Sequence, residues 1–165
     1  MQLATVLRVA RSHLGVRETA RNRGVLIDKW QRGVGLILPE DQHAPGHPWC
    51  ACYVCGVIRE ANGGVRPLWW HDSASALGLV AHNGGLLLAD KRLIRPGNVY
   101  VMDHGQGRGH CGFVDSVINV RGVITFPDIS GNSNDEGGRE GVEVCSNLRA
   151  LDDPHIVAIL RLPLA

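Results

Sequence analysis

A cysteine, a histidine and an asparagine stand at positions where they could form a thiol catalytic site. Cys50 follows Pro48 and Trp49 and begins an apolar stretch. Because proline is favoured in the first turn of a helix, we expect Cys50 to lie at a helix N-terminus. Unpaired backbone N–H groups and the helix dipole lower the pKa of a thiol there. The thiolate is the nucleophilic form of cysteine, so this position favours covalent catalysis.

His110 and Asn132 could complete this site. His110 begins a strand-like segment after a glycine-rich turn, and a neutral imidazole there could take the thiol proton and later protonate a leaving amine. Asn132 lies on a later strand-like segment, with an ordinary turn asparagine as the alternative. Its amide oxygen could fix the imidazole tautomer, and Asp128 is an alternative orienting residue. His104, within the turn, is more typical of a turn residue. This order of residues is that of papain-like thiol hydrolases.

The cysteines could instead suggest a metal site or disulfides. There are five of them: Cys50, Cys52, Cys55, Cys111 and Cys145. Structural zinc sites usually combine two cysteine pairs on turns, whereas the first three thiols fall on different faces of one predicted helix and no second pair exists. An odd number leaves at least one thiol free, and a reducing compartment gives little reason for disulfides. We therefore expect no metal and no cofactor.

Length and composition predict one domain that covers residues 1–165. The 165 residues are 44% hydrophobic and 20% charged, which is ordinary for a globular protein with its own core. The net charge of +1 gives no electrostatic case for nucleic acid or an anionic membrane. No stretch approaches the roughly 18–20 apolar residues of a membrane helix, and the first residues do not resemble a signal peptide. We expect a protein made in the cytoplasm, with no membrane anchor and no nucleic-acid partner.

The order of the predicted elements indicates an α+β domain. Apolar residues at helical spacing predict helices at about residues 3–14, 23–33, 50–61 and 72–81, the last capped by Asp72 or Ser73. Alternating apolar residues predict strands at about residues 99–102, 111–118, 122–126 and 155–162. Residues 37–48 have the composition of a surface loop. Helices followed by strands favour an antiparallel sheet.

The chain resembles the cysteine, histidine-dependent amidohydrolase/peptidase (CHAP) family, papain-like hydrolases that cut peptidoglycan, and in particular the subgroup common in bacteriophage endolysins. Two motifs carry most of the resemblance, Pro48-Trp49-Cys50-Ala51 and Gly109-His110-Cys111-Gly112-Phe113-Val114. The rest of the chain adds shorter matches in the expected order: Glu18, Asn22-Arg23-Gly24, Arg95-Pro96-Gly97-Asn98-Val99, Asp103-His104-Gly105, Gly131-Asn132-Ser133-Asn134-Asp135 and Gly138-Arg139-Glu140-Gly141.

This resemblance implies a papain-like fold, with N-terminal helices packed on a C-terminal antiparallel sheet. It implies Cys50 as the nucleophile, His110 as the general base and acid, and Asn132 as the orienting residue. The backbone N–H of Cys50 would contribute to an oxyanion hole. Many relatives carry a glutamate where this chain has Ser130, and small or apolar residues at three cysteine positions to which we assign packing roles: Cys52, Cys55 and Cys111.

Other sites in the family are less well matched. Some members hold calcium on an early Asp-rich loop, for which this chain offers Glu18 and Asp28, too few hard oxygen ligands. Four residues are candidates for lining a substrate groove: Glu18, Trp49, Trp69 and Trp70. For the tryptophans, packing in the core is the alternative.

The resemblance implies a monomeric enzyme that cuts an amide of the peptidoglycan stem peptide or its junction with muramic acid. We expect it to be present in the host cytoplasm, without a separate wall-binding domain, and to reach the wall after release. Two alternatives remain: a secreted antibacterial amidase effector and a non-catalytic wall-binding module.

Overall fold

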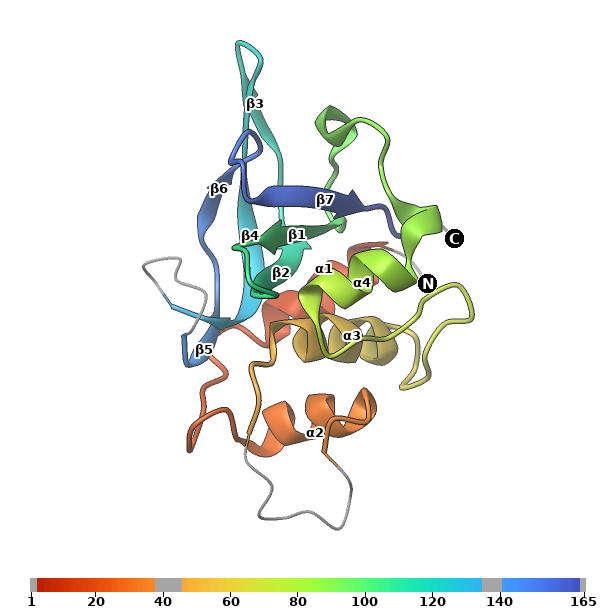
Figure 1. Ribbon diagram of the computed structural model, residues 1–165, viewed down its shortest axis with the longest axis vertical. Coiled ribbons are helices and arrows are strands. Elements are labelled where there is room, and N and C mark those ends of the chain that lie inside the picture. Colours follow the sequence, from red (N-terminus) through yellow and green to blue (C-terminus); the bar gives the residue numbers. More distant parts are fainter. Residues whose placement is uncertain (1–2, 38–45, 135–140, 164–165) are drawn as a thin grey trace.

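Helices form the first half of the chain and strands the second half. The computed structural model describes residues 3–37, 46–134 and 141–163 (Figure 1). Its helices are α1 (Leu3–Ser12), α2 (Val25–Gly33), α3 (Cys50–Ala61) and α4 (Ala76–His82), followed by the 3-10 turns η1 (Gly84–Leu86) and η2 (Lys91–Leu93). Its strands are β1 (Val99–Asp103), β2 (Gly109–Val114), β3 (Ile118–Val120), β4 (Val123–Ser133), β5 (Glu143–Cys145), β6 (Leu148–Ala150) and β7 (Ile156–Leu160).

The strands form one antiparallel sheet in the order β3-β4-β2-β1-β7, with β5 and β6 both paired to β4 (strands labelled in Figure 1). β4 is 11 residues long, and it pairs with β3 and β6 near its start, with β2 in its middle and with β5 near its end. The fold is therefore α+β with an antiparallel sheet, as expected from the sequence. It places β2 and β4 side by side.

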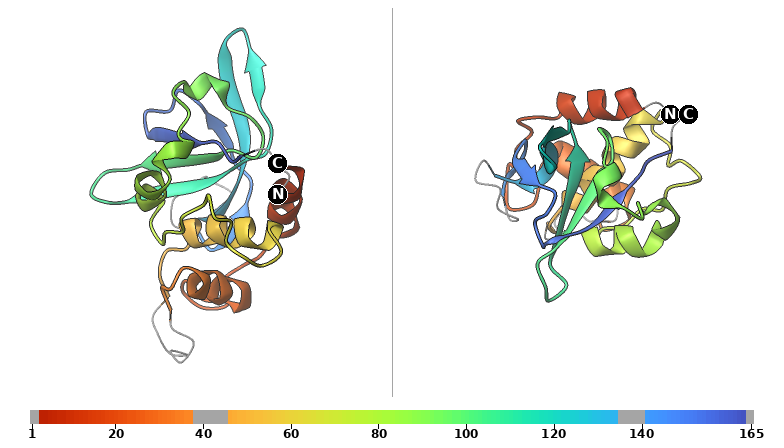
Figure 2. Two further views of the ribbon diagram at one scale, coloured as in Figure 1. Left: turned by 90° about the vertical axis from the view of Figure 1, so that its right-hand side faces the viewer. Right: turned by 90° about the horizontal axis from the view of Figure 1, so that it is seen from above.

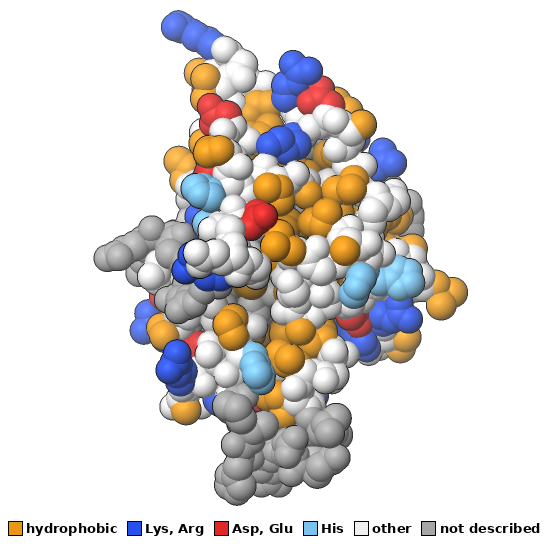
Figure 3. All heavy atoms as spheres, viewed as in Figure 1, with side chains coloured by type: hydrophobic (Ala, Val, Ile, Leu, Met, Phe, Trp, Pro, Cys, Tyr) orange, Lys and Arg blue, Asp and Glu red, His pale blue; other side chains and the backbone are white. Residues whose placement is uncertain are grey.

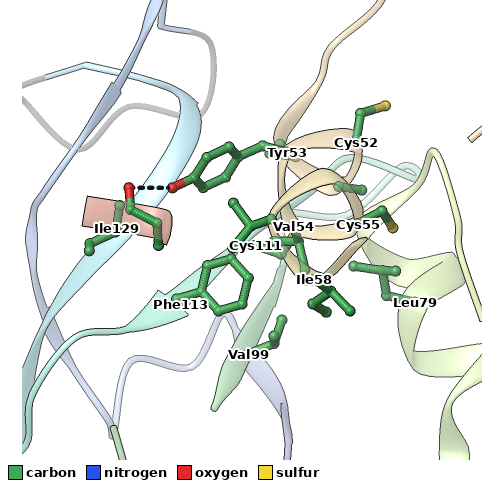
Figure 4. Packing of buried hydrophobic residues seen from close by; sticks show 14 of the residues in the cluster. Cys52, Tyr53, Val54, Cys55, Ile58, Leu79, Val99, Cys111, Phe113 and Ile129 are labelled. Carbon is green, nitrogen blue, oxygen red and sulfur yellow. Dashed lines mark hydrogen bonds between the residues drawn. The ribbon is translucent and has the colours of Figure 1, made fainter. Parts of the chain in front are cut away.

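α3 lies between the sheet and α2 (Figures 1 and 2). A Cβ at Gly56 would lie 2.2 Å from the Trp30 ring of α2, so a glycine is required at this helix contact. On another side of α3, the Tyr53 hydroxyl donates a 3.1 Å hydrogen bond to the carbonyl of Ala10 in α1 (Figure 4). Every residue of the first half of α3 is buried, which fixes the helix start relative to the sheet.

Alternation along β1 and β2 gives the sheet two buried faces. The face toward α3 carries Val99 and Val101 of β1 and two residues of β2, Cys111 and Phe113 (Figure 4). The opposite face belongs to a second apolar cluster, which includes Tyr100 and other residues: Met102, Val114, Phe126 and Ile159. Both faces of this part of the sheet therefore exclude water.

The helices lie close to their predicted positions, with one corrected N-cap. α3 begins at Cys50, as predicted. α4 begins at Ala76 and is capped by Ser75, whose side chain accepts from Gly78 N, and not by Asp72 or Ser73. Both predicted caps have other partners, because Asp72 pairs with Arg59 and the Ser73 hydroxyl accepts from the backbone N–H of Ser75.

The strand predictions need three corrections. The segment 111–118 is not one strand, because β2 ends at Val114 and β3 begins at Ile118. The segment 122–126 is only the start of β4, which continues to Ser133. β5 and β6, each three residues long, were not predicted. Most of the predicted loop 37–48 lies outside the described residues.

Charged side chains do not segregate on the face shown in Figure 3, where basic and acidic groups of the described residues are interspersed. Within the described ranges, no helix is both long and apolar enough to cross a membrane.

Candidate active site

Cys50 is the first residue of α3 and is 6% exposed. Its pKa lies well below the usual value for a cysteine. The adjacent Cys111 thiol contributes most to this shift, and His110 and the backbone N–H of Ala51 add to it, whereas burial opposes it. The first turn of the helix therefore contributes as predicted, but a neighbouring thiol contributes more. A lowered pKa favours the thiolate, the nucleophilic form of a cysteine.

Cys111 is a residue whose part in this site the sequence did not reveal. It was assigned a packing role, and it does belong to the apolar face of β2 that meets α3 (Figure 4). Burial raises its own pKa well above the usual value, and the neighbouring Cys50 raises it further. Cys111 therefore stays protonated and can donate its S–H to the Cys50 thiolate. Since neighbours on a strand point to opposite faces, nothing in the sequence indicated that both Cys111 and His110 reach Cys50.

His110 lies near the start of β2, opposite Met102 of β1, and is 2% exposed. Its ring lies 6.2 Å from that of Tyr100, centroid to centroid. It interacts with Cys50 strongly enough to lower the thiol pKa, yet neither buried ring nitrogen makes a well-formed hydrogen bond with the described residues. Both nitrogens remain available for proton transfer, and catalytic hydrogen bonds often tighten only when substrate binds.

Asn132 lies inside β4, on a strand as expected, and not in a turn. β4 pairs with β2 at Phe113 and Ile129, three residues before Asn132 in β4 and three residues after His110 in β2. Asn132 is 3% exposed and has a φ of 57°, at a point where the pairing of β4 with β5 is irregular. The two residues therefore lie at adjacent ends of neighbouring strands.

The end of β4 also packs against the start of α3. A Cβ at Gly131 would lie 2.4 Å from the Trp49 ring, so glycine permits this approach. Trp49 is the residue before Cys50, and Gly131 is the residue before Asn132. This contact brings the predicted orienting residue close to the predicted nucleophile.

Asp128, the alternative orienting residue, is fully buried and has four other partners. Its carboxylate accepts hydrogen bonds from the side chains of Tyr100, Ser130 and Arg149 and from the backbone N–H of Asn147. Its hydrogen bonds therefore hold the far face of the sheet together, next to the ring of Tyr100 that borders His110. Ser130, where many relatives carry a glutamate, is one of these partners.

The residues predicted to line a substrate groove have different surroundings. Trp49 and Trp70 are fully buried, which leaves neither side chain a surface for a ligand and corrects that expectation. Trp49 stacks on Trp30 with a centroid distance of 5.8 Å. Trp69 is half-buried and remains a candidate. Glu18 is also half-buried, and its carboxylate accepts from Trp49 Nε1 at 2.8 Å.

A groove of about 550 Å³ is lined in part by Glu18 and Asn132. Its lining comes from the loop before α2, the segment before α3, the end of β4 and the two residues before β5: Glu18, Arg21, Asn22, Gly46, Pro48, Asn132, Gly141 and Val142. Asn132 and Pro48 place this groove next to the start of α3. Substrate could approach the buried Cys50 from here.

The remaining thiols differ from Cys50. All five cysteines are free and buried. Burial is the main cause that raises the pKa of each of the other four, and that of Cys55 reaches about 12. Cys55 points toward α4 and lies 3.6 Å from the carbonyl of Ser73. Across the described residues, no three histidine, cysteine or acidic side chains are grouped as a metal site requires.

The helices packed on an antiparallel sheet, with Cys50 at the start of α3 and His110 in β2, are consistent with a papain-like fold. Residues 42–129 match the CHAP domain, and the chain belongs to this family. The matched range includes Cys50 and His110 and ends before Asn132. Neither the curated proteins nor the solved structures contain a significant match to the chain. Membership of the family supports a peptidoglycan hydrolase or amidase/peptidase function.

Proposed function

We propose that this protein is an endolysin that cleaves an amide bond of the peptidoglycan peptide, with Cys50 as the nucleophile. One observation supports this most directly: Cys50 is the one cysteine whose pKa is lowered, and it lies at a helix start beside His110. The other four thiols are held protonated by burial. The chemistry of the site is therefore concentrated on a single sulfur.

The proposed reaction has two steps. In the first, the Cys50 thiolate, whose proton has passed to His110, attacks the carbonyl carbon of the amide. Backbone N–H groups at the start of α3, including that of Cys50, donate to the developing oxyanion. His110 then donates its proton to the departing nitrogen, the C–N bond breaks, and a thioester remains on Cys50.

In the second step, water hydrolyses the thioester. His110 accepts a proton from the attacking water and returns it to the sulfur as the C–S bond breaks. Asn132 orients the imidazole during both steps through its side-chain amide. The products are a free carboxylic acid and an amine, and Cys50 is regenerated.

Mass spectrometry of digested peptidoglycan tests this proposal. Purified wild-type protein should release soluble fragments whose masses name the bond, either the muramoyl–alanine amide or a peptide bond of the stem or cross-bridge. Cys50→Ala should release none. Cys52→Ala, which removes a buried thiol from the same helix, should release the same fragments as wild type. Equal cleavage by wild type and Cys50→Ala would eliminate Cys50 as the nucleophile.

The endolysin role needs a separate experiment, because a secreted effector could perform the same cleavage. The protein is produced in the bacterial cytoplasm, and the inner membrane is then permeabilised. Rapid lysis with wild type but not with Cys50→Ala is expected for a lysin that acts from inside. Cleavage of isolated walls without such lysis would support the hydrolase activity but contradict the endolysin role. Wall binding without any cleavage would favour a non-catalytic module.

A further inference from the structure

The groove beside Asn132 presents one cationic side chain that has no partner within the described part of the chain. Of the described residues that line it, only Glu18 and Arg21 carry a formal charge. Both oxygens of Glu18 are engaged, one by Trp49 Nε1 and the other by the backbone N–H of Asn22, each at 2.8 Å. Arg21 is exposed, and none of the observed hydrogen bonds or ion pairs among described residues involves its guanidinium.

The turn that carries Arg21, residues 20–23, is held firmly. The N–H of Arg23 donates to the carbonyl of Ala20 at 2.8 Å and closes the turn. Gln31, fully buried in α2, donates from Nε2 to the carbonyl of Asn22 at 2.9 Å. The turn therefore presents Arg21 from a fixed backbone, which reduces the entropic cost of binding a ligand.

The same groups connect this turn to the nucleophile. Gln31 Nε2 also donates to the carbonyl of His47 at 3.0 Å, three residues before Cys50. Glu18 links the turn to Trp49, the residue before Cys50. The turn and the start of α3 thus form one hydrogen-bonded unit, and Asn132 lines the same groove. A ligand bound by Arg21 would have a defined position relative to the reacting sulfur.

We propose that Arg21 binds a free carboxylate of the peptidoglycan stem peptide and so makes the enzyme selective for walls in which this group is not amidated. The proposal rests on the proposed function. A guanidinium recognises a carboxylate through two parallel hydrogen bonds, and it binds a neutral amide less well. Stem peptides carry carboxylates on their acidic residues and at their C-terminus, and amidation removes the charge. The partly buried Glu18, with both oxygens occupied, is a poor partner for an amine.

Binding to inactive protein tests this directly. Cys50→Ala protein is titrated by calorimetry with two synthetic stem peptides that differ only in whether their carboxylates are free or amidated. We expect the free peptide to bind about tenfold more tightly or better. Adding Arg21→Gln should remove this difference, and Arg21→Lys should retain part of it. Arg8→Gln, which removes an exposed arginine of α1 outside the groove, should leave it unchanged.

Cleavage of the same peptides by active protein separates this inference from the proposed function. Equal binding of the two peptides, or a preference that survives Arg21→Gln, would overturn the role of Arg21. If Cys50-dependent cleavage persisted in that case, the proposed hydrolase activity would be retained without a carboxylate-binding role for Arg21. If neither peptide were cleaved while the Arg21-dependent preference in binding remained, the proposed hydrolase activity would be refuted and the carboxylate-binding role of Arg21 would be supported.

Discussion

Trp49 Nε1 donates a 2.8 Å hydrogen bond to Glu18 Oε1 and so ties the N-cap of α3 to the loop before α2. The ring of Trp49 is fully buried and lies between Trp30 and the end of β4. It thereby fixes the residue that precedes Cys50 against two other parts of the fold. Trp49 therefore positions the start of α3, whereas other residues form the surface of the groove.

Trp49→Phe should therefore impair catalysis more than its effect on stability suggests. It removes the donor to Glu18 and should cost about 1–2 kcal/mol of unfolding free energy. Because the start of α3 loses its anchor, we expect kcat/KM to fall by about tenfold. Trp30→Phe is the control, since Trp30 Nε1 has no hydrogen-bond partner in the described structure. Equal losses of kcat/KM in the two variants, measured with a soluble stem peptide, would contradict this role.

Cys111→Ala should raise the pKa of Cys50, because the Cys111 thiol is the largest cause of its lowering. The rate of alkylation of Cys50 by iodoacetamide, followed by mass spectrometry across pH, reports the thiolate directly. Its midpoint should move to higher pH in Cys111→Ala, and activity on the acid side should fall accordingly. Cys111→Ser keeps a hydrogen-bond donor, so its alkylation midpoint should lie between those of Cys111→Ala and wild type. An unchanged midpoint would assign Cys111 to packing alone.

Asn132→Gly separates the side-chain amide from the backbone at this position. Glycine adopts the φ of 57° without strain, so stability should change little while activity falls by about tenfold or more. Asn132→Ala should show the same loss of activity and an added cost of about 1–2 kcal/mol, because alanine lacks the polar side chain that lets asparagine tolerate this left-handed conformation. Urea unfolding and kcat at saturating substrate distinguish the two effects. Full activity of Asn132→Gly would remove the orienting role.

Stability should decline at alkaline pH, in part through Cys55. Burial raises its pKa to about 12 in the folded protein, whereas an unfolded thiol ionises near about 8.5. The folded state thus keeps a proton that the unfolded state loses, and the contribution of this thiol is full below about pH 8.5 and is lost as pH rises toward 12.

Cys55→Ala should make this decline shallower by up to about 1.4 kcal/mol per pH unit between pH 8.5 and 10. The slope comes from urea unfolding at several pH values. Cys50→Ala is the control, because the pKa of Cys50 is lowered and not raised in the folded protein, so its removal should not make the alkaline decline shallower. Parallel curves for wild type and Cys55→Ala would contradict the expected shift.

The sequence allowed the helix start at Cys50 to be predicted because Pro48 and the following apolar run are local signals. It also allowed the strand that begins near His110 to be predicted, since alternation is visible over a few residues. A strand at Asn132 was also expected, but the left-handed backbone conformation of this residue could not be predicted in this way. It depends on pairing with β5, a three-residue strand with no pattern of its own.

The burial of Trp49 and the nearness of Cys111 to Cys50 have a similar explanation. Both follow from how α3 seats on the sheet, which involves residues distant in the chain. An aromatic residue next to a predicted nucleophile gives the same local signal whether it lines a groove or fills the core. The distinction came from the stacking on Trp30 and the close approach of Gly131.

The contrast between one ionisable thiol and four that burial holds protonated has a practical consequence. A mild electrophile at neutral pH should label one sulfur per molecule without any engineering of the other cysteines. Such a reagent could therefore be used to titrate the fraction of protein in a preparation that has a reactive Cys50. The same property makes Cys50 the point of attachment for a covalent inhibitor or a fluorescent reporter, while the other four cysteines remain unreactive toward the reagent.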